Sequence, residues 1–262
     1  MTNQTSEIEP ESPLHLFDGK LGALQGLLLE MTELLMYQLE QTLHALDYAD
    51  ADLALRVIAR DRKVDDYQAR IENEVHLLLD ASLTLPSDLR TLMIVSKMAG
   101  TLEKIGNEVA DFARLSESLL ACHGAADNAE LLTDIIKIGR MIKIMLDKMA
   151  VVQETRYSNQ AYKLMRYGWN CDTLLQQSLE HQLVIMTRSS SGIDHSLDAL
   201  RILKALERCA GLSRHIAEYQ ILMLDSVDMR RLSTPDNAPS RHDYAHEHRA
   251  SFAPGKALQL RQ

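Results

Sequence analysis

The chain has 262 residues, of which 46% are hydrophobic, 25% charged and 5% aromatic, and its formal net charge is −9 at pH 7. This length and apolar content allow a substantial core, and the low aromatic content with many Leu, Met and Ala residues favours packed helices over a sheet. The lack of a strongly basic stripe excludes a typical nucleic-acid-binding protein, and the negative charge excludes adsorption to anionic lipid by charge alone.

Cysteine usage and hydropathy indicate the compartment. Cys122, Cys171 and Cys209 are widely spaced and form no CxxC motif, which is typical of reduced thiols in a cytosolic protein. No apolar run reaches membrane-spanning length, and the N-terminus is polar and acidic rather than signal-like. We therefore expect a cytoplasmic protein without a transmembrane segment.

The first half of the chain predicts a flexible leader followed by three helices. Residues 1–20 form the leader, with two prolines among polar residues. Leucines at helical spacing predict a first helix from about Gly22 to Leu46, and a second is expected over Ala51–Ala81. The third begins at Pro86, because proline is tolerated in a first turn, and runs to about Ala121.

The third helix carries an apolar pattern and two internal glycines. Its apolar residues recur at three-, four- and seven-residue steps and predict the buried face: Leu89, Leu92, Met93, Ala99 and Leu102. Gly100 and Gly106 interrupt this helix, and each costs about 1 kcal/mol relative to alanine. We expect a neighbouring helix to approach closely at both positions.

The second half repeats the first. After a connector at residues 122–128, helices are predicted over about Ala129–Val152, over Tyr157–Thr187, and from the break at Ser189–Gly192 to about Asp225. The segment LEKIGNEVADFAR at Leu102 aligns with LERCAGLSRHIAE at Leu206. We predict an all-α protein of two tandem three-helix bundles with six long helices, at residues 21–122 and 123–230, and a disordered tail at 231–262.

An acidic spacing is superimposed on the apolar pattern of the first bundle. Asp61 and Asp65 are four residues apart and share one helix face, and Glu103 and Asn107 repeat this spacing on the next helix. Such carboxylates repel each other unless a cation or a basic group lies between them. Oxygen ligands of this kind suit Mg²⁺, Mn²⁺ or ferric iron. The alternative is a solvated helix face that pairs locally with its own arginines and lysines.

Three segments, RVIARDRKVDD, SDLR…VSK and LEKIGNEVADFAR, together resemble the PhoU family of phosphate-uptake regulators. That family pairs D-x-x-x-D on one helix with L-E-R-I-G-D on the next. The resemblance extends from about Leu24 to Leu224 and is more specific in the first half. It implies that divalent or ferric metal ions are held by the repeated acidic motifs, here Asp61, Asp65, Glu103 and Asn107.

The chain departs from this family pattern mainly in its second half. Asn107 replaces the last acid of the first motif, and Gly211 replaces it in the second. Gly168 stands where the first half has Asp61, so that only Asp172 and Glu207 remain. Because affinity for a cation depends on the number and charge of its ligands, we expect the second site to be weak or lost.

The resemblance also implies a function and partners. It implies a non-enzymatic negative regulator of phosphate uptake and phosphate-responsive signalling, acting as an adaptor between the phosphate ABC transporter and a phosphate-sensing histidine kinase. Such a protein would be cytoplasmic, would lie at the inner membrane through its partners, and is compatible with a homodimer.

Other functions are less well supported by the sequence. It contains no P-loop, GxSxG or HExxH motif, so an enzyme is not expected. One alternative is an accessory regulatory domain of a different anion transporter. Another is a metal-binding helical protein of the di-metal carboxylate type, which requires Glu-x-x-His pairs that the facing helices lack.

Overall fold

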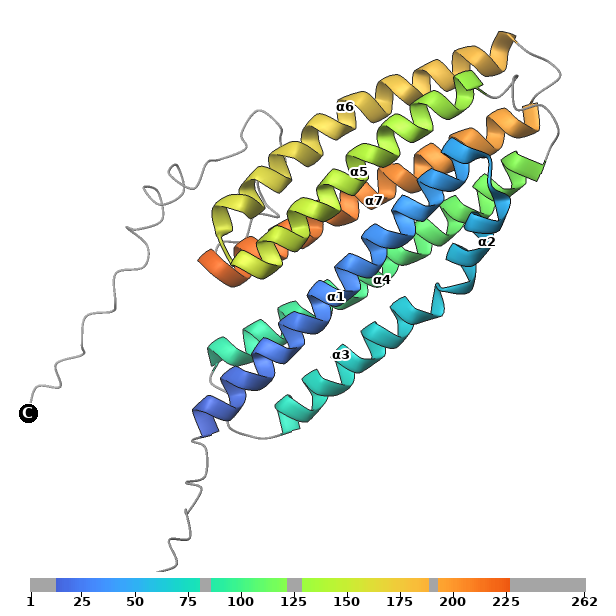
Figure 1. Ribbon diagram of the computed structural model, residues 1–262. Coiled ribbons are helices and arrows are strands. Elements are labelled where there is room, and N and C mark those ends of the chain that lie inside the picture. Colours follow the sequence, from blue (N-terminus) through green and yellow to red (C-terminus); the bar gives the residue numbers. More distant parts are fainter. Residues whose placement is uncertain (1–12, 81–85, 122–128, 189–192, 227–262) are drawn as a thin grey trace, which may run out of the picture.

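The computed structural model describes residues 13–80, 86–121, 129–188 and 193–226 (Figure 1). All regular structure within these ranges is helical, which confirms the all-α prediction. The helices are α1 (Pro13–Tyr48), α2 (Ala51–Ala59), α3 (Arg62–Asp80), α4 (Pro86–Ala121), α5 (Ala129–Thr155), α6 (Ser158–Arg188) and α7 (Ile193–Asp225). None of them combines the length and apolarity needed to cross a bilayer. The connector at 122–128, residues 1–12 of the leader and the whole of the predicted tail at 231–262 lie outside the described residues.

Helix α1 begins earlier than its leucine pattern indicates. It starts at Pro13 and not at about Gly22, because a proline at the first helical position loses no needed N–H group. Residues 13–20 therefore belong to α1 and not to the leader, which corrects that boundary.

The predicted second helix is divided into α2 and α3. Asp50 caps α2, since its Oδ1 accepts hydrogen bonds from the N–H groups of Asp52 and Leu53 at 3.0 and 3.2 Å. At the end of α2, four backbone N–H groups donate to the carbonyl three residues earlier, the spacing of a 3₁₀ turn; the donors are Arg60, Asp61, Lys63 and Val64. This tight turn places Asp61 between the two helices rather than inside one.

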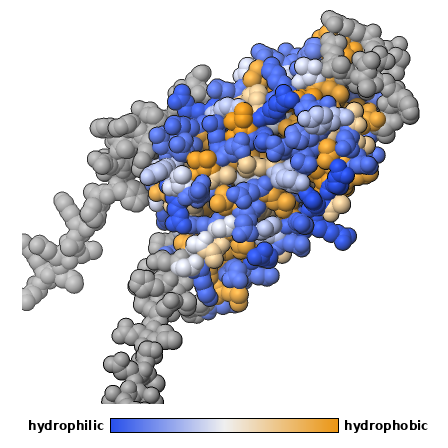
Figure 2. All heavy atoms as spheres, in the orientation of Figure 1, coloured by the Kyte–Doolittle hydropathy of each residue, from blue (hydrophilic) through white to orange (hydrophobic). Residues whose placement is uncertain are grey.

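The helices form two groups that lie side by side (Figure 1). Helices α1 to α4 make one group and α5 to α7 the other, and the groups meet where α4 packs against α7 and α1 against α5. Helix α3 packs on α1 and α4, and α6 packs on α5 and α7. Buried side chains of both groups belong to one continuous hydrophobic core. The face drawn in Figure 2 shows hydrophobic residues scattered among hydrophilic ones.

The two glycines of α4 differ in their surroundings. A Cβ atom on Gly106 would lie 2.9 Å from Val64 Cγ1 and 3.3 Å from Leu35 Cδ2, so α3 and α1 approach the backbone closely there. A Cβ atom on Gly100 would meet only Gln68 Nε2, at 3.8 Å, which is an ordinary contact. The expectation of close approach is confirmed at Gly106 and wrong at Gly100.

The predicted buried face of α4 is wider than the core that covers it. Leu92 and Leu102 are fully buried, as expected. Leu89 and Met93 are instead 43% and 53% exposed, because no helix of the described chain packs over that edge of α4. Leu197 of α7 is likewise partly exposed, at 38%. These residues lie along the outer side of the α4–α7 contact.

Substitution of the two α4 glycines should have opposite effects on stability. Gly106→Ala is expected to lower the free energy of unfolding by about 1–2 kcal/mol, because Val64 is stiff at χ1 and cannot yield to the new methyl group without strain. Gly100→Ala should raise it by up to about 1 kcal/mol through helix propensity. Urea denaturation followed by circular dichroism measures both, and a stabilised Gly106→Ala protein would contradict the packing described here.

Candidate functional site

In the first half, an arginine occupies the space beside the predicted acidic site. Asp61 lies in the turn between α2 and α3, and Asp65 lies in the first turn of α3. Arg114 of α4 reaches across to Asp61, with Nη2 3.3 Å from Oδ2, and also pairs with Asp111 one turn earlier on α4. The chain itself therefore supplies a basic partner for Asp61 and for Asp111.

Asp61 is electrostatically strained despite this partner. Burial raises its pKa above the ordinary value, and the neighbouring charges of Asp65 and Asp111 raise it further. The charge and hydrogen bond of Arg114 lower the pKa, but by less than the other causes raise it. The folded chain consequently binds a proton at Asp61 more tightly than the unfolded chain does.

Glu103 and Asn107 bond to each other on α4. Asn107 Nδ2 donates a hydrogen bond to Glu103 Oε1 at 2.6 Å, one turn away on an exposed face. Among the residues that the structure describes, no group of three or more His, Cys, Asp or Glu side chains is placed to hold a metal ion. The structure thus brings Asp61 to Arg114 and Glu103 to Asn107, but it does not assemble a ligand set from Asp61, Asp65 and Glu103.

In the second half, the guanidinium of Arg214 lies beside the residues that correspond to Asp61 and Asp65. Arg214 of α7 donates from Nη1 to Asp172 Oδ1 at 2.6 Å and to the backbone oxygen of Gly168 at 3.2 Å. A Cβ atom on Gly168 would lie 2.6 Å from Arg214 Cγ, so only glycine leaves room for this side chain. Gly211 also lies beside it, since a Cβ there would be 3.8 Å from Arg214 Nη2. Where the first half has acids, the second half thus has two glycines and the guanidinium of Arg214.

The sequence pattern does not indicate a role for Arg214, although it marks Gly168 and Gly211 as the two glycines that replace acids. Glu207, the other remaining acid, forms a local ion pair with Lys204 at 2.6 Å on the surface of α7. Neither Asp172 nor Glu207 is therefore without a counter-charge.

A further arginine joins the two halves. Arg208 of α7 donates from Nε and Nη2 to the two carboxylate oxygens of Glu108 on α4, each at 2.6 Å. This bidentate geometry is the strongest form of such a pair, and the hydrogen bond with Glu108 raises the pKa of Arg208. It links α4 of the first half to α7 of the second.

The donor set as arranged does not fit a resident metal ion. Binding of a metal ion at Asp61 would require Arg114 to move away from that carboxylate. Binding by Asp172 and Glu207 would require the displacement of Arg214 and Lys204. Metal binding in the first half stays a prediction.

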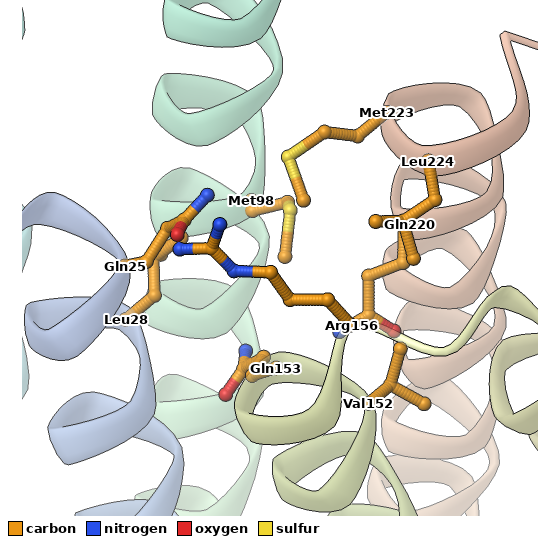
Figure 3. A pocket seen from close by; sticks show the side chains of 9 residues that line it. All are labelled: Gln25, Leu28, Met98, Val152, Gln153, Arg156, Gln220, Met223 and Leu224. Atoms are coloured by element: carbon orange, nitrogen blue, oxygen red, sulfur yellow. The ribbon is translucent and has the colours of Figure 1, made fainter. Parts of the chain in front are cut away.

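Polar side chains also meet at one end of the contact between the halves (Figure 3). Gln25 of α1, Gln153 of α5 and Gln220 of α7 surround a space of about 10 Å³, and Arg156, from the turn after α5, extends across it. Within the described chain, Gln220 is 1% exposed and neither atom of its amide has a hydrogen-bond partner. Both amide atoms of Gln153 and the amide oxygen of Gln25 likewise have no hydrogen-bond partner within the described chain. A space of this size accommodates one water molecule, which could bridge these amides.

The buried thiols are unsuited to nucleophilic chemistry. Burial raises the pKa of Cys171 to about 11, and it raises the pKa of the fully buried Cys209 further. Both are free cysteines. At neutral pH they are protonated, and only the thiolate is an effective nucleophile.

The fold and its charge pairs define a class of protein. It is an all-helical protein of two side-by-side helix groups, whose polar features are interhelical carboxylate–arginine pairs. Residues 28–116 match the family model described as the PhoU domain. The resemblance of the chain to the PhoU family is confirmed.

Relatives match along both halves. A phosphate-specific transport system accessory protein PhoU homolog from Clostridium acetobutylicum is 24% identical over 80% of this chain and 94% of its own length. The homolog from Pseudomonas aeruginosa is 25% identical over 82% of this chain and 88% of its own, and the Escherichia coli accessory protein PhoU is 23% identical over the same shares.

Solved structures share the fold. The crystal structure of PhoU from Pseudomonas aeruginosa superposes with a TM-score of 0.76 at 24% identity, and it covers 80% of this chain and 100% of the crystallised one. The phosphate transport system regulatory protein PhoU from Streptococcus pneumoniae gives a TM-score of 0.72 at 22% identity, over 81% and 98% of the two chains.

The pKa of Asp61 predicts a pH-dependent effect of Asp61→Asn. A raised folded-state pKa contributes stability that is fully present below the unfolded pKa and is lost as pH rises through the folded value. Asp61→Asn should therefore raise the melting temperature at pH 7, with a gain that disappears at about pH 3. The control is Asp47→Asn, which breaks the interhelical pair with Arg140 and should stabilise at neither pH. A lower melting temperature of Asp61→Asn at pH 7 would show that Arg114 outweighs burial.

If the first half binds a cation, metal should stabilise it selectively. Added Mn²⁺, Mg²⁺ or Fe³⁺ should raise the melting temperature, because the ion binds only the folded chain. The free energy of unfolding should rise by up to about 3 kcal/mol at an ion concentration a hundredfold above the Kd. Asp65→Asn should remove most of this gain, and Asp172→Asn should leave it unchanged. An untagged preparation that contains no bound ion, and whose melting does not respond to these ions, would refute the prediction.

Proposed function

We propose that this protein is a non-enzymatic accessory regulator of a phosphate transport system. The observation that carries the proposal is similarity along both halves, over about four-fifths of the chain, to proteins named as phosphate-specific transport system accessory proteins. The similarity continues past the PhoU domain of the first half into α5 to α7, so the whole two-group architecture is shared rather than one domain.

The site chemistry supports a binding role rather than catalysis. Its arginines are paired with carboxylates between helices, an arrangement that fixes helix positions and leaves no free nucleophile among the groups described above. The buried thiols are protonated at neutral pH. A regulator of this kind acts by contact with partners, through its helix faces.

The finer proposal concerns partners and direction. The protein would act on the cytoplasmic side of the membrane as a negative regulator, linking the phosphate ABC transporter to a phosphate-sensing histidine kinase. It would keep the phosphate-starvation response low while phosphate is plentiful. The homology supports this role only at the level of phosphate transport, so the kinase link depends on the genetic test below.

Deletion of the gene should raise expression of a phosphate-starvation reporter while phosphate is abundant. Reporter activity and phosphate uptake are measured together in the parent strain, the deletion strain and a strain complemented with the full chain, which should restore repression. The double variant Asp172→Ala/Arg214→Ala offers a second control, because it removes interactions between α6 and α7 inside the chain, and it should complement once circular dichroism shows that it is folded. Normal repression with unaltered phosphate uptake in the deletion strain would instead favour an accessory role at a different anion transporter.

A further inference from the structure

The outer side of the α4–α7 contact presents two grooves. The first, of about 300 Å³, is lined mainly by residues of the N-terminal turns of α4 and the C-terminal turns of α7, namely Leu89, Arg90, Met93, Lys97, Tyr219 and Leu222. The second, of about 550 Å³, lies near the other ends of the same helices. Its floor is apolar, with Leu115, Leu197 and Leu200, and its rim includes Arg201 and Arg208.

Helix geometry places both grooves on one face. Met93 and Asp111 of α4 line different grooves and are 18 residues apart, as are Arg201 and Tyr219 of α7. Eighteen residues are about five full turns of an α-helix, so each pair points in the same direction. The grooves are therefore about 27 Å apart along one continuous surface, at about 1.5 Å per residue. A helix of about 20 residues is long enough to occupy both.

This face carries apolar residues at helical spacing that are exposed to solvent. Leu89, Met93 and Leu197 follow the apolar pattern of their helices, yet each is more than a third exposed. An apolar pattern that the folded chain leaves uncovered is typical of a surface that a partner covers.

The charge of this face is opposite to that of the chain. Arg90 and Lys97 border the first groove, no carboxylate lines it, and neither side chain has an ion-pair partner among the described residues. The second groove is lined by four cationic side chains and one carboxylate. Those four are paired with Asp61, Asp198, Glu207 and Glu108, so the uncompensated positive charge is concentrated at the first groove. In a chain of net charge −9, this surface selects for an acidic ligand.

We propose that the α4–α7 face docks an acidic amphipathic helix of a protein partner, with its apolar residues in the grooves and its carboxylates against Arg90 and Lys97. This inference rests on the proposed function for the existence of a partner, and it adds the surface and the chemistry of recognition. Docking of a helix in an apolar groove through anchors at i, i+3, i+4 and i+7 is a recurring mode of recognition.

Other occupants match the face less well. Residues 227–262, which follow α7 in the sequence, contain six cationic residues and four carboxylates, the wrong balance for a cationic groove. An anionic membrane surface is usually bound by clusters of four to eight cations, whereas the first groove has two without partners.

The test uses the full chain and a synthetic probe. The probe is a fluorescein-labelled helical peptide of about 20 residues, with leucines at i, i+3, i+4 and i+7 spacing and glutamates flanking them. The comparison peptide carries lysine at each glutamate position. Fluorescence anisotropy should show saturable binding of the glutamate peptide, at least tenfold tighter than the lysine peptide and weakened by added salt.

Matched charge reversals locate the binding face. Arg90→Glu/Lys97→Glu should weaken binding by about tenfold or more. The control is Lys163→Glu/Arg166→Glu, which reverses two exposed cations on α6 and should leave binding unchanged. Met93→Ser should weaken binding several-fold at an unchanged melting temperature, because this side chain is already half exposed.

Four results would overturn the proposal. The first two are no binding of the glutamate peptide below about 1 mM, and a loss of peptide binding in the α6 control equal to that in Arg90→Glu/Lys97→Glu. The other two are binding of phosphatidylglycerol vesicles by the wild-type chain and not by this variant, and a dimer in sedimentation that this variant converts to monomer. The last two would assign the face to a membrane or to a second copy. Because the peptide assay does not depend on phosphate, its failure alongside a derepressed deletion strain would leave the proposed function intact. Binding alongside normal repression would refute only that function.

Discussion

The packing of α4 against α7 is the contact on which the rest of the molecule depends. Each of these helices belongs to a different half, and each also packs against the outer helix of its own half, α3 or α6. Their inner sides contribute to the common core, and an ion pair between Arg208 and Glu108 joins them. Because of this shared contact, neither half can tilt or slide without disturbing the core of the other, and the outer grooves keep a fixed spacing.

Much of the helical architecture could be predicted from the sequence, because its signals are local. Pro86 marks the start of α4, and the gaps near residues 122–128 and 189–192 separate helices whose apolar period is clear. The division between α2 and α3 could not be predicted from periodicity, because Val57, Val64 and Ile71 keep a seven-residue spacing across it and all three are buried. A tight turn that preserves the buried face leaves no trace in an apolar pattern.

The site could be predicted only in part, because spacing locates acids but not their partners. The sequence placed Asp61 and Asp65 together on one side of a helix, and it identified the glycines that replace acids in the second half. The counter-charges are remote: Arg114 lies 53 residues from Asp61, and Arg214 lies 42 residues from Asp172. Which of several arginines reaches a given carboxylate depends on helix positions that only the folded core fixes.

The space beside Gly168 is filled by the Arg214 side chain, which gives the α5–α7 half a permanent positive charge next to Asp172. The guanidinium of Arg214 is covalently part of the chain, so it is present at every ion concentration, and it stays charged at any pH that a cell encounters. The α5–α7 half thus carries its neutralising charge as part of its own covalent structure. Chelators, mineral starvation or a change in cellular ion content leave that charge in place.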